Sequence, residues 1–461
     1  MRTIALFFGY YSGAAYAVVN PLFGTLLFMH MLLLRPEFLV WGNRAFGRLY
    51  LAVFLCALLG FLSGGSRPSS TNRWSTRGLL ILGAFVVWSW FASLVAEHSV
   101  DASVSQAIDL SKIWLLCWLL SCVIIERRAI TAYVTVVGGS AALVGLWGIF
   151  QARAGNPRLD ELGIGGSNFL AAELVLVTPM CLVAALEPRR ALSQRLVYFG
   201  IPALLVVLCI FYTGSRGGFL GLAASLVFLA MTVGRKRLAA VLGVAIVGAV
   251  LVSSLVPARV SDRLRTTFVS DVDELDTSAA ARTALWQIAV RVWAKHPIAG
   301  VGLYNFSAAK DELFRNGEIE EFKQDIEEHI INQPRFPHSM YLGLLAETGA
   351  VGVILIAWVI GRAVLARLPR SLGSRDEVDE LVLVGRGVQA GVMGFAVTAC
   401  FGDFQYIELL YAQIMLIGAV RGASTAEAAE RERGAVERST QSDRSTPARA
   451  DDRKLSHEDA H

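Results

Sequence analysis

Apolar stretches long enough to cross a membrane recur along most of the chain. A membrane-spanning helix needs roughly 17 to 25 predominantly apolar residues. Stretches of this kind lie near residues 48–63, 77–96, 107–125, 130–151, 167–187, 196–213, 217–234, 238–256, 350–367, 383–402 and 406–420. Residues 4–34 form two shorter apolar stretches divided by Asn20-Pro21, which predict either one broken crossing or two. The pattern therefore predicts an all-α, polytopic membrane helical bundle with about 12 or 13 transmembrane helices.

One long polar segment, residues 257–338, interrupts this apolar pattern. Apolar residues recur within it at steps of three and four, namely Leu285, Ile288, Ala289 and Val292. This spacing predicts an amphipathic helix that lies against the bilayer or the bundle, with Trp286 and Trp293 at headgroup depth. We expect His296-Pro297 to end that helix, and a second, acidic helix to follow at about 318–329.

The composition confirms that one soluble core cannot hide the apolar surface of this chain. Hydrophobic residues make up 54%, charged residues 17%, and the mean hydropathy is +0.52. Basic residues gather on alternate loops, at Arg67–Arg77, Arg127–Arg128, Arg189–Arg195, Arg235–Arg237 and Arg362–Arg375. By the positive-inside rule these loops are cytoplasmic, so residues 257–338 face outward, into the periplasm of a Gram-negative host. Arg35, Arg44 and Arg48 do not fit this assignment.

Four segments follow from these patterns. Residues 1–256 are expected to form an N-terminal transmembrane bundle, 257–338 an external catalytic loop with helices, and 339–421 the C-terminal transmembrane helices. Residues 422–461 mix charges with Ser, Thr and Ala and contain few large aliphatic side chains, which predicts a disordered cytoplasmic tail. All cysteines lie in apolar segments, so no disulfide framework is expected.

A glycine-rich turn between two predicted spans is the first candidate for chemistry. It reads Thr213-Gly214-Ser215-Arg216-Gly217-Gly218, and the next helix opens at its end. Glycines let the backbone approach a ligand closely, and the first amides of a helix attract anions. We therefore expect Arg216 to bind an anion and Gly214, Ser215 and Gly217 to contact the substrate. Alternatively, Arg216 is an interfacial residue that reaches lipid headgroups.

Two residues of the polar segment are further candidates. Arg282 lies one turn ahead of Trp286 and is either a solvated surface charge or a phosphate ligand. His338 follows Pro337 where the segment returns to the membrane, and an imidazole there can exchange a proton near neutral pH. An idle surface histidine is the alternative. Neither a metal-ligand spacing nor a convincing metal-binding acidic motif occurs, so no metal is expected.

Ionisable residues inside predicted spans are costly and are therefore functional candidates. They are Asp109, Lys112, Glu173, Glu347, Arg386, Asp403 and Glu408. Asp109 and Lys112 can pair along one helix face. Glu347 lies just inside from His338, where it either orients an arginine or accepts a substrate hydroxyl, or else pairs only to hold helices together.

Three stretches together resemble the family of bacterial O-antigen ligases and polymerases. They are the Gly-Ser-Arg-Gly-Gly turn at 214–218, the segment from Arg282 through Pro297-Ile298-Ala299-Gly300-Val301-Gly302 to Tyr304-Asn305-Phe306, and His338-Ser339-Met340-Tyr341-Leu342 followed by Glu347-Thr348-Gly349. The resemblance covers about residues 165–420. Asn20-Pro21-Leu22-Phe23-Gly24 and Gly165-Gly166-Ser167-Asn168-Phe169 are similar to the branch of O-glycosylation ligases associated with exosortase systems.

The resemblance implies a fold like that of the C-type membrane glycosyltransferases and a reaction outside the inner membrane. A glycan would pass from undecaprenyl diphosphate to a lipid, glycan or protein hydroxyl, without a cofactor, a metal or a nucleotide sugar. It implies catalytic roles for His338, Arg216 and Arg282 and substrate contacts from Tyr304, Asn305 and Glu347. His338 would either deprotonate the acceptor or hydrogen-bond the diphosphate.

Two other functions are compatible with the sequence. The first is a polymerase, in which the acceptor is another carrier-linked repeat unit. The second is a transporter or lipid-glycan flippase, which many spans alone would permit. The concentration of charge in one external segment, without an inverted repeat, favours an enzyme.

Overall fold

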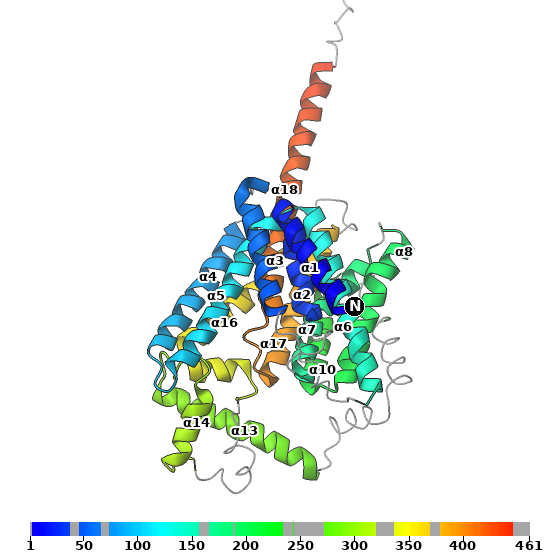
Figure 1. Ribbon diagram of the computed structural model, residues 1–461. Helices are drawn as coiled ribbons and strands as arrows, with labels where there is room; N and C mark the ends of the chain where they lie inside the picture. Colours follow the sequence, from blue (N-terminus) through cyan, green and yellow to red (C-terminus); the bar gives the residue numbers. More distant parts are fainter. Residues whose placement is uncertain are drawn as a thin grey trace, which may run out of the picture.

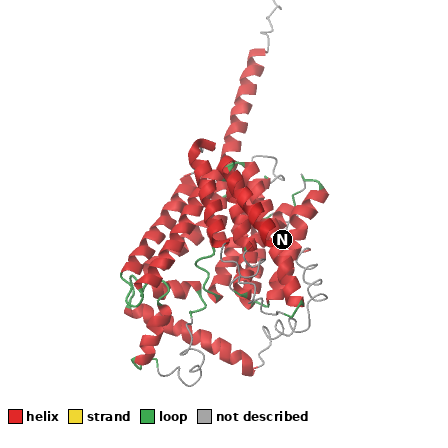
Figure 2. Cartoon of the chain, in the orientation of Figure 1, coloured by secondary structure: helices red, strands yellow, loops and turns green. Residues whose placement is uncertain are grey.

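The computed structural model describes residues 2–36, 46–65, 73–155, 166–187, 190–233, 243, 272–319, 336–368 and 379–445. Every regular element in these ranges is a helix (Figures 1 and 2). The helices are α1 Arg2–Val19, α2 Pro21–Leu34, α3 Phe46–Gly60, α4 Arg73–Leu94, α5 Val100–Val123, α6 Arg127–Arg153, α7 Ser167–Ala185, α8 Leu192–Arg195, α9 Ile201–Thr213, α10 Arg216–Thr232, α13 Val272–Lys295, α14 Phe306–Arg315, α16 Met340–Val364, α17 Glu380–Thr398 and α18 Glu408–Ser445.

Eight candidate membrane spans confirm a multi-pass membrane protein. By length and composition they are Arg73–Leu94, Val100–Val123, Arg127–Arg153, Ser167–Ala185, Leu192–Thr213, Met340–Val364, Glu380–Phe401 and Glu408–Glu430. Four shorter apolar helices accompany them, at Leu6–Val19, Pro21–Leu34, Arg48–Gly64 and Arg216–Thr232. The expected span at 238–256 lies outside the described residues. The described part of the chain therefore supports a helical bundle, and the full number of crossings stays a prediction.

The apolar start of the chain forms two helices rather than one broken helix. Asn20 caps α2, because its side-chain oxygen accepts the backbone N–H of Phe23 at 3.0 Å, and Pro21 occupies the first helical position. A side chain at Gly24 would lie 2.4 Å from the Cβ atom of Ala17. The two helices therefore fold back on each other at this sharp turn, with their backbones in close contact.

Helix α7 forms the centre of the bundle. Its buried side chains belong to the main hydrophobic core, and α17 packs closely along it. Small residues allow this contact, because a Cβ atom at Gly391 would lie 2.3 Å from the carbonyl oxygen of Leu176. A Cβ atom at Gly394 would lie 2.5 Å from the carbonyl oxygen of Gly221, so α17 also touches α10. Glycines thus replace bulky side chains where three helices meet.

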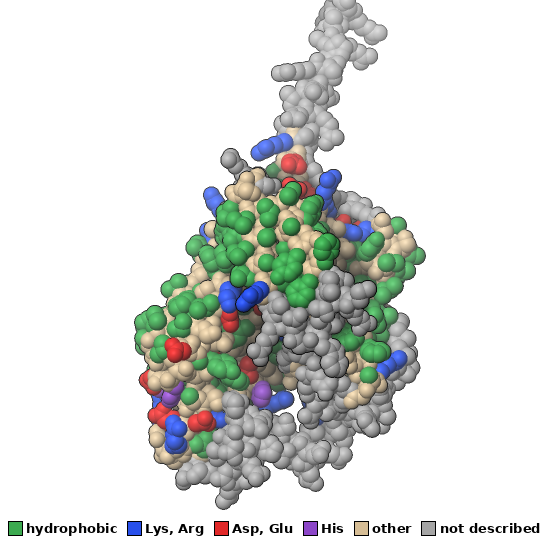
Figure 3. Space-filling model, viewed as in Figure 1, with side chains coloured by type: hydrophobic (Ala, Val, Ile, Leu, Met, Phe, Trp, Pro, Cys, Tyr) green, Lys and Arg blue, Asp and Glu red, His purple; other side chains and the backbone are tan. Residues whose placement is uncertain are grey.

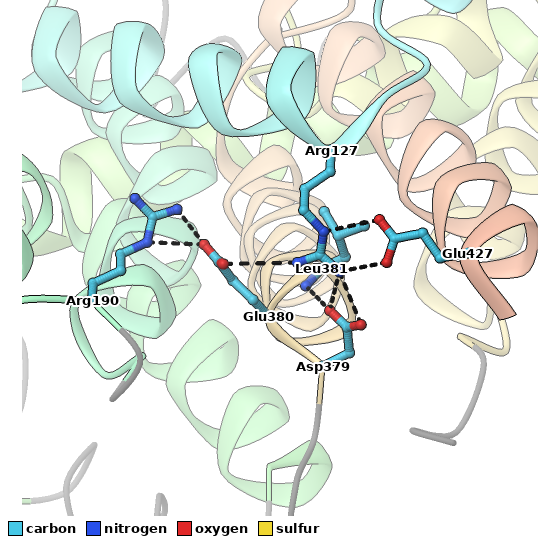
Figure 4. Close-up of polar contacts among 6 residues, drawn as sticks. All are labelled: Arg127, Arg190, Asp379, Glu380, Leu381 and Glu427. Atoms are coloured by element: carbon cyan, nitrogen blue, oxygen red, sulfur yellow. Dashed lines mark hydrogen bonds and ion pairs between the residues drawn. The ribbon is translucent and has the colours of Figure 1, made fainter. Parts of the chain in front are cut away.

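The two ends of the bundle differ in character. Helices α13 and α14 lie across one end, whereas α18 leaves the bundle at the other (Figure 1). Hydrophobic side chains cover much of the flank in Figure 3, and charged and histidine side chains gather at the lower left. At the α18 end, Arg127 contacts Asp379 at 2.8 Å and Glu427 at 2.6 Å, and Arg190 pairs with Glu380 (Figure 4).

Helix α18 corrects one prediction for the C-terminal segment. It continues through Ser445, so residues 422–445 are helical where the sequence predicts disorder. Alanine, glutamate and arginine dominate this stretch, and these are strong helix formers that need no buried face. Residues 446–461 lie outside the described residues.

Candidate functional site

The glycine-rich turn joins α9 to α10 through two adjacent caps. Gly214 closes α9 in the left-handed conformation, with φ of 62°. Ser215 then caps α10, because its hydroxyl accepts the backbone N–H of Gly218 at 3.1 Å. The same hydroxyl donates to the side-chain oxygen of Asn168 at 2.7 Å. Arg216, the first residue of α10, is thereby held where the helix N-terminus favours an anion.

The glycines after Arg216 have a packing role. A Cβ atom at Gly217 would lie 3.0 Å from that of Phe401, and one at Gly218 would lie 2.6 Å from that of Ala171. The absence of side chains therefore lets α10 press against α7 and the end of α17. A direct substrate contact from Gly214, Ser215 or Gly217 stays a prediction.

Helix α13 confirms the amphipathic periodicity and decides which surface it covers. The predicted stripe is buried, and it packs on α14 and the start of α16. Trp286 donates its indole N–H to the carbonyl oxygen of Pro337 at 2.9 Å. Trp293 donates to the carbonyl oxygen of Pro297 at 3.1 Å. The helix therefore lies against the bundle, and both indole N–H groups bind protein carbonyls.

The two glycine-containing motifs of the sequence bind each other. The backbone N–H groups of Val301 and Gly302 donate to the carbonyl oxygens of Ala346 and Glu347, at 3.0 and 2.9 Å. Helix α16 is interrupted at Gly349, with φ of 66°, and this break frees those carbonyls. A side chain at Gly349 would lie 2.0 Å from the oxygen of Ile298. The external segment is therefore attached to α16 by hydrogen bonds between the two backbones.

Tyr304 and Asn305 have different environments. Tyr304 has a positive φ of 63°, which is strained for a residue with a side chain. The residue is 49% exposed, and its ring lies 5.0 Å from the ring of Phe336, centroid to centroid. The Asn305 amide is buried and binds the backbone of Ser99 and Val301. Asn305 thus supports the loop between α4 and α5, whereas Tyr304 faces outward.

His338 lies beside a carboxylate that comes from the loop between α17 and α18. Asp403 accepts the backbone N–H of His338 at 3.1 Å, and its oxygen lies 3.6 Å from the imidazole Nδ1. His338 has a left-handed backbone, with φ of 53°, and its side chain is 42% exposed. The strained backbone and the carboxylate together hold the ring at the surface of the site.

Asp403 itself is largely buried. Burial raises the pKa of its carboxyl to about 6, and the backbone N–H groups of His338 and Ser339 partly offset this effect. Glu347 lies nearby in α16, and its Oε2 atom is buried without a hydrogen-bond partner among the described residues. The backbone amides of Tyr304 and Phe306 approach the Glu347 carboxyl. The acidic groups of the site are therefore held by backbone donors.

Arg216 and Arg282 lie close to each other, although they come from different helices. Burial and the charge of Arg216 lower the pKa of the Arg282 guanidinium. Arg282 precedes Trp286 by one turn of α13, and Trp286 binds the residue before His338. Arg216 in turn adjoins Gly217, which packs on Phe401, just before Asp403. These contacts link both arginines to His338, through Trp286 on one side and through Gly217, Phe401 and Asp403 on the other.

Sequence reasoning missed the pairing of Asp403 with His338. The only signal was that Asp403 is an ionisable residue between two apolar segments. The two residues are 65 positions apart, and no local pattern relates them.

The comparison with known families agrees with this geometry. Residues 201–357 match a family model described as O-antigen ligase. The match begins in α9 and ends within α16, so it contains the glycine turn, Arg282, His338 and Glu347. No curated protein matches the chain. The matched residues include both arginines and the histidine of the candidate site, so this part of the chain is similar to the O-antigen ligase family.

Proposed function

We propose that this protein transfers a glycan from undecaprenyl diphosphate to an acceptor hydroxyl at the periplasmic face of the bacterial inner membrane. The observation that carries the proposal is the electrostatic proximity of Arg216 and Arg282, which contacts through Trp286 and Gly217 link to the His338–Asp403 pair. Two neighbouring guanidinium groups repel each other, and a diphosphate would relieve that repulsion. The family match supports ligase or polymerase chemistry in general.

The leaving group explains why two arginines are needed. A lipid diphosphate carries at least two negative charges, and guanidinium groups bind phosphate oxygens bidentately and remain charged at neutral pH. Arg216 and Arg282 would stabilise the charge that develops on the departing diphosphate. One such contact typically contributes about 3 to 4 kcal/mol to transition-state stabilisation. This arrangement would let the reaction proceed without a metal ion.

His338 would act as the general base. Its imidazole takes the proton of the acceptor hydroxyl as that oxygen attacks the anomeric carbon from the face opposite the diphosphate. The bond between the anomeric carbon and the diphosphate oxygen breaks, so the configuration inverts. The Asp403 carboxylate beside Nδ1 would stabilise the imidazolium, which favours a base over a simple diphosphate ligand.

The remaining residues suggest how sugar and acceptor are held. The exposed ring of Tyr304 beside Phe336 offers an apolar face on which a sugar can stack. Glu347 would accept a hydroxyl, since one of its oxygens is buried without a partner among the described residues. Gly214, Ser215 and Gly217 would contact the diphosphate through the start of α10.

The orientation in the membrane follows from the basic end of the bundle. Arg127 and Arg190 lie at the end where α18 leaves, opposite α13 (Figures 1 and 4). By the positive-inside rule that end would be cytoplasmic, and the site would then lie on the periplasmic side.

Transfer in reconstituted vesicles tests the proposal. The full-length protein, supplied with carrier-linked glycan and acceptor, should form product in EDTA with an inverted anomeric linkage. If product never forms while glycan crosses the bilayer, the protein is a flippase. A deletion strain separates the two enzymatic alternatives: loss of glycan attachment indicates a ligase, and loss of chain length indicates a polymerase.

A further inference from the structure

Three arginines from three helices gather around one indole ring at the end of the bundle where α18 leaves (Figure 1). Arg362 of α16 donates to the carbonyl oxygen of Trp74 at 2.7 Å, and its guanidinium lies 4.6 Å from the centroid of the Trp74 ring. The guanidinium of Arg421, on α18, lies 5.9 Å from the same centroid. Arg77, on α4, and Arg421 are both close enough for their charges to act on Arg362. These four residues form an arginine–indole cluster that joins α4, α16 and α18.

The arginine–indole cluster is cationic. No carboxylate of the described residues forms an ion pair with its three arginines, whereas Arg127 and Arg190 at the same end are neutralised by acidic side chains (Figure 4). The Nε atom of Arg362 is buried and has no hydrogen-bond partner in the part of the chain that the structure describes. A buried donor of a charged group is costly to leave unpaired, and neighbouring like charges repel. A bound anion would relieve both costs.

An exposed apolar surface continues from the cluster along the flank of the bundle. Leu80 lies one turn after Arg77 in α4, and Trp358 lies one turn before Arg362 in α16. Both side chains are exposed, as is Leu365 at the end of α16. Residues three or four positions apart share a helix face, so each arginine lies nearer the helix end than the apolar side chain beside it. A phospholipid presents its charged headgroup and its acyl chains in the same order.

We propose that the arginine–indole cluster binds the phosphodiester headgroup of an anionic phospholipid in the leaflet at the α18 end, with the acyl chains over Leu80 and Trp358. Guanidinium groups form charge-assisted hydrogen bonds with phosphate oxygens, and basic pockets between membrane helices recognise anionic headgroups. The ammonium group of phosphatidylethanolamine would add a positive charge to a cluster without a paired carboxylate. Free phosphate would contact the arginines but not the apolar surface. The lipid site is distinct from the site of Arg216 and does not depend on glycan transfer.

Native mass spectrometry of the full-length protein measures the affinity for added phosphatidylglycerol and phosphatidylethanolamine. Wild type should bind phosphatidylglycerol about tenfold more tightly, because only its headgroup has a net negative charge. Arg362→Gln should weaken phosphatidylglycerol binding about fivefold, and Arg362→Gln combined with Arg421→Gln about 25-fold, since each basic residue near a membrane surface contributes about a factor of five. Arg128→Gln is the matched control, because Arg128 is an exposed arginine at the start of α6, at the same end of the bundle. Its binding should equal that of wild type.

Photo-cross-linking locates the lipid in the wild-type protein, so this test does not depend on the folding of a variant. The probe is a phosphatidylglycerol with a diazirine on the first carbons of one acyl chain, added to the full-length protein in nanodiscs. Cross-links are expected on Leu80, Trp358 and Leu365. Excess unlabelled phosphatidylglycerol should remove them, whereas the same excess of phosphatidylethanolamine should not. Cross-links that both lipids remove equally would identify ordinary surrounding lipid and overturn the inference.

The remaining outcomes separate a lipid site from other roles of the arginines. Equal losses of affinity in Arg128→Gln and Arg362→Gln would mean that the charge of this end attracts anionic lipid without a defined site, which overturns the inference. An equal loss of affinity for both lipids in Arg362→Gln would show that Arg362 only holds α16 against α4. If inorganic phosphate raised the melting temperature in detergent as much as phosphatidylglycerol does, the ligand would be a soluble anion and the lipid assignment would fail.

Discussion

Two arginine clusters at opposite ends of the bundle have opposite surroundings. At the α18 end, Arg127 and Arg190 are surrounded by Asp379, Glu380 and Glu427, and their charges are neutralised (Figure 4). At the α13 end, Arg216 and Arg282 lie close to each other, and neither forms an ion pair with a carboxylate among the described residues. Carboxylates of the protein neutralise the first cluster, whereas a bound anion would neutralise the second.

The comparison shows how to separate structural charges from functional charges in a membrane protein. A paired cluster joins α6, α17 and α18, so its removal should affect folding more than chemistry. Two adjacent cations without a carboxylate are held together by the fold at a cost in repulsion. Such a cost is typical of a binding site, where a ligand supplies the missing charge.

The largest effect is expected from the arginine pair. Arg216→Ala and Arg282→Ala should each reduce transfer about 100- to 1,000-fold, because each removes a contact to the departing diphosphate. Thermal stability should not fall, since removing one of two repelling charges costs no ion pair. Arg291→Ala on the same helix α13 is the control and should retain activity. Wild-type activity in Arg282→Ala would remove that residue from the site.

Asp403→Asn should have the next largest effect, about 100-fold on transfer, because the imidazolium of His338 loses its carboxylate. The acid side of the pH–rate profile should also move to lower pH, because the variant removes the carboxylate beside the imidazole. A loss of activity without any change in the profile would instead indicate a structural role.

Asp403→Asn should change thermal stability in the direction opposite to its effect on transfer. Burial raises the pKa of this carboxyl from 3.8 to about 6, so the folded protein binds the proton more tightly than the unfolded chain. That stabilisation is complete below about pH 4 and is lost as the pH rises through about 6. At pH 7 the Asn variant, which cannot ionise, should melt at or above the wild-type temperature in a thermal-shift assay.

Gly349→Ala should have an intermediate effect, on stability and on the docking of the external segment. Its left-handed φ and the 2.0 Å approach of the Ile298 oxygen leave no room for a Cβ atom. The strain should cost about 1 to 3 kcal/mol and loosen the docking of the external segment on α16. Hydrogen exchange should increase at Val301 and Gly302. Gly361→Ala, in open space on the same helix, should leave exchange at these two residues unchanged.

The smallest effect on activity is expected from the paired cluster. Arg127→Gln leaves Asp379 and Glu427 without their shared cation, which should lower unfolding stability by about 1 to 2 kcal/mol, since the cluster is partly exposed. Transfer in vesicles should stay within about twofold of wild type, a difference of less than 0.5 kcal/mol. A loss of activity as large as that of Arg216→Ala would contradict the distinction between the two clusters.

The helices were the most predictable part of this protein. The stripe from Leu285 to Val292 is buried as its spacing predicts, and α13 ends at Lys295, just before His296-Pro297. The prediction of disorder was wrong for residues 422–445, because alanine, glutamate and arginine favour a helix even where hydrophobicity is low. The substrate contact expected of Asn305 stays a prediction, and the structure shows that its side-chain amide binds the backbone of Ser99.

Hydrophobic length and periodicity determined the bundle and the external helix, because these features depend on neighbours within a few turns. The glycine turn and the family resemblance indicated the candidate arginines. Only the tertiary structure decided which charges meet. The contact between His338 and Asp403 crosses 65 residues, and that between Arg35 and Glu173 crosses 138. Long-range contacts of this kind depend on how helices pack, through glycines such as Gly217 and Gly349, and no local pattern encodes that packing.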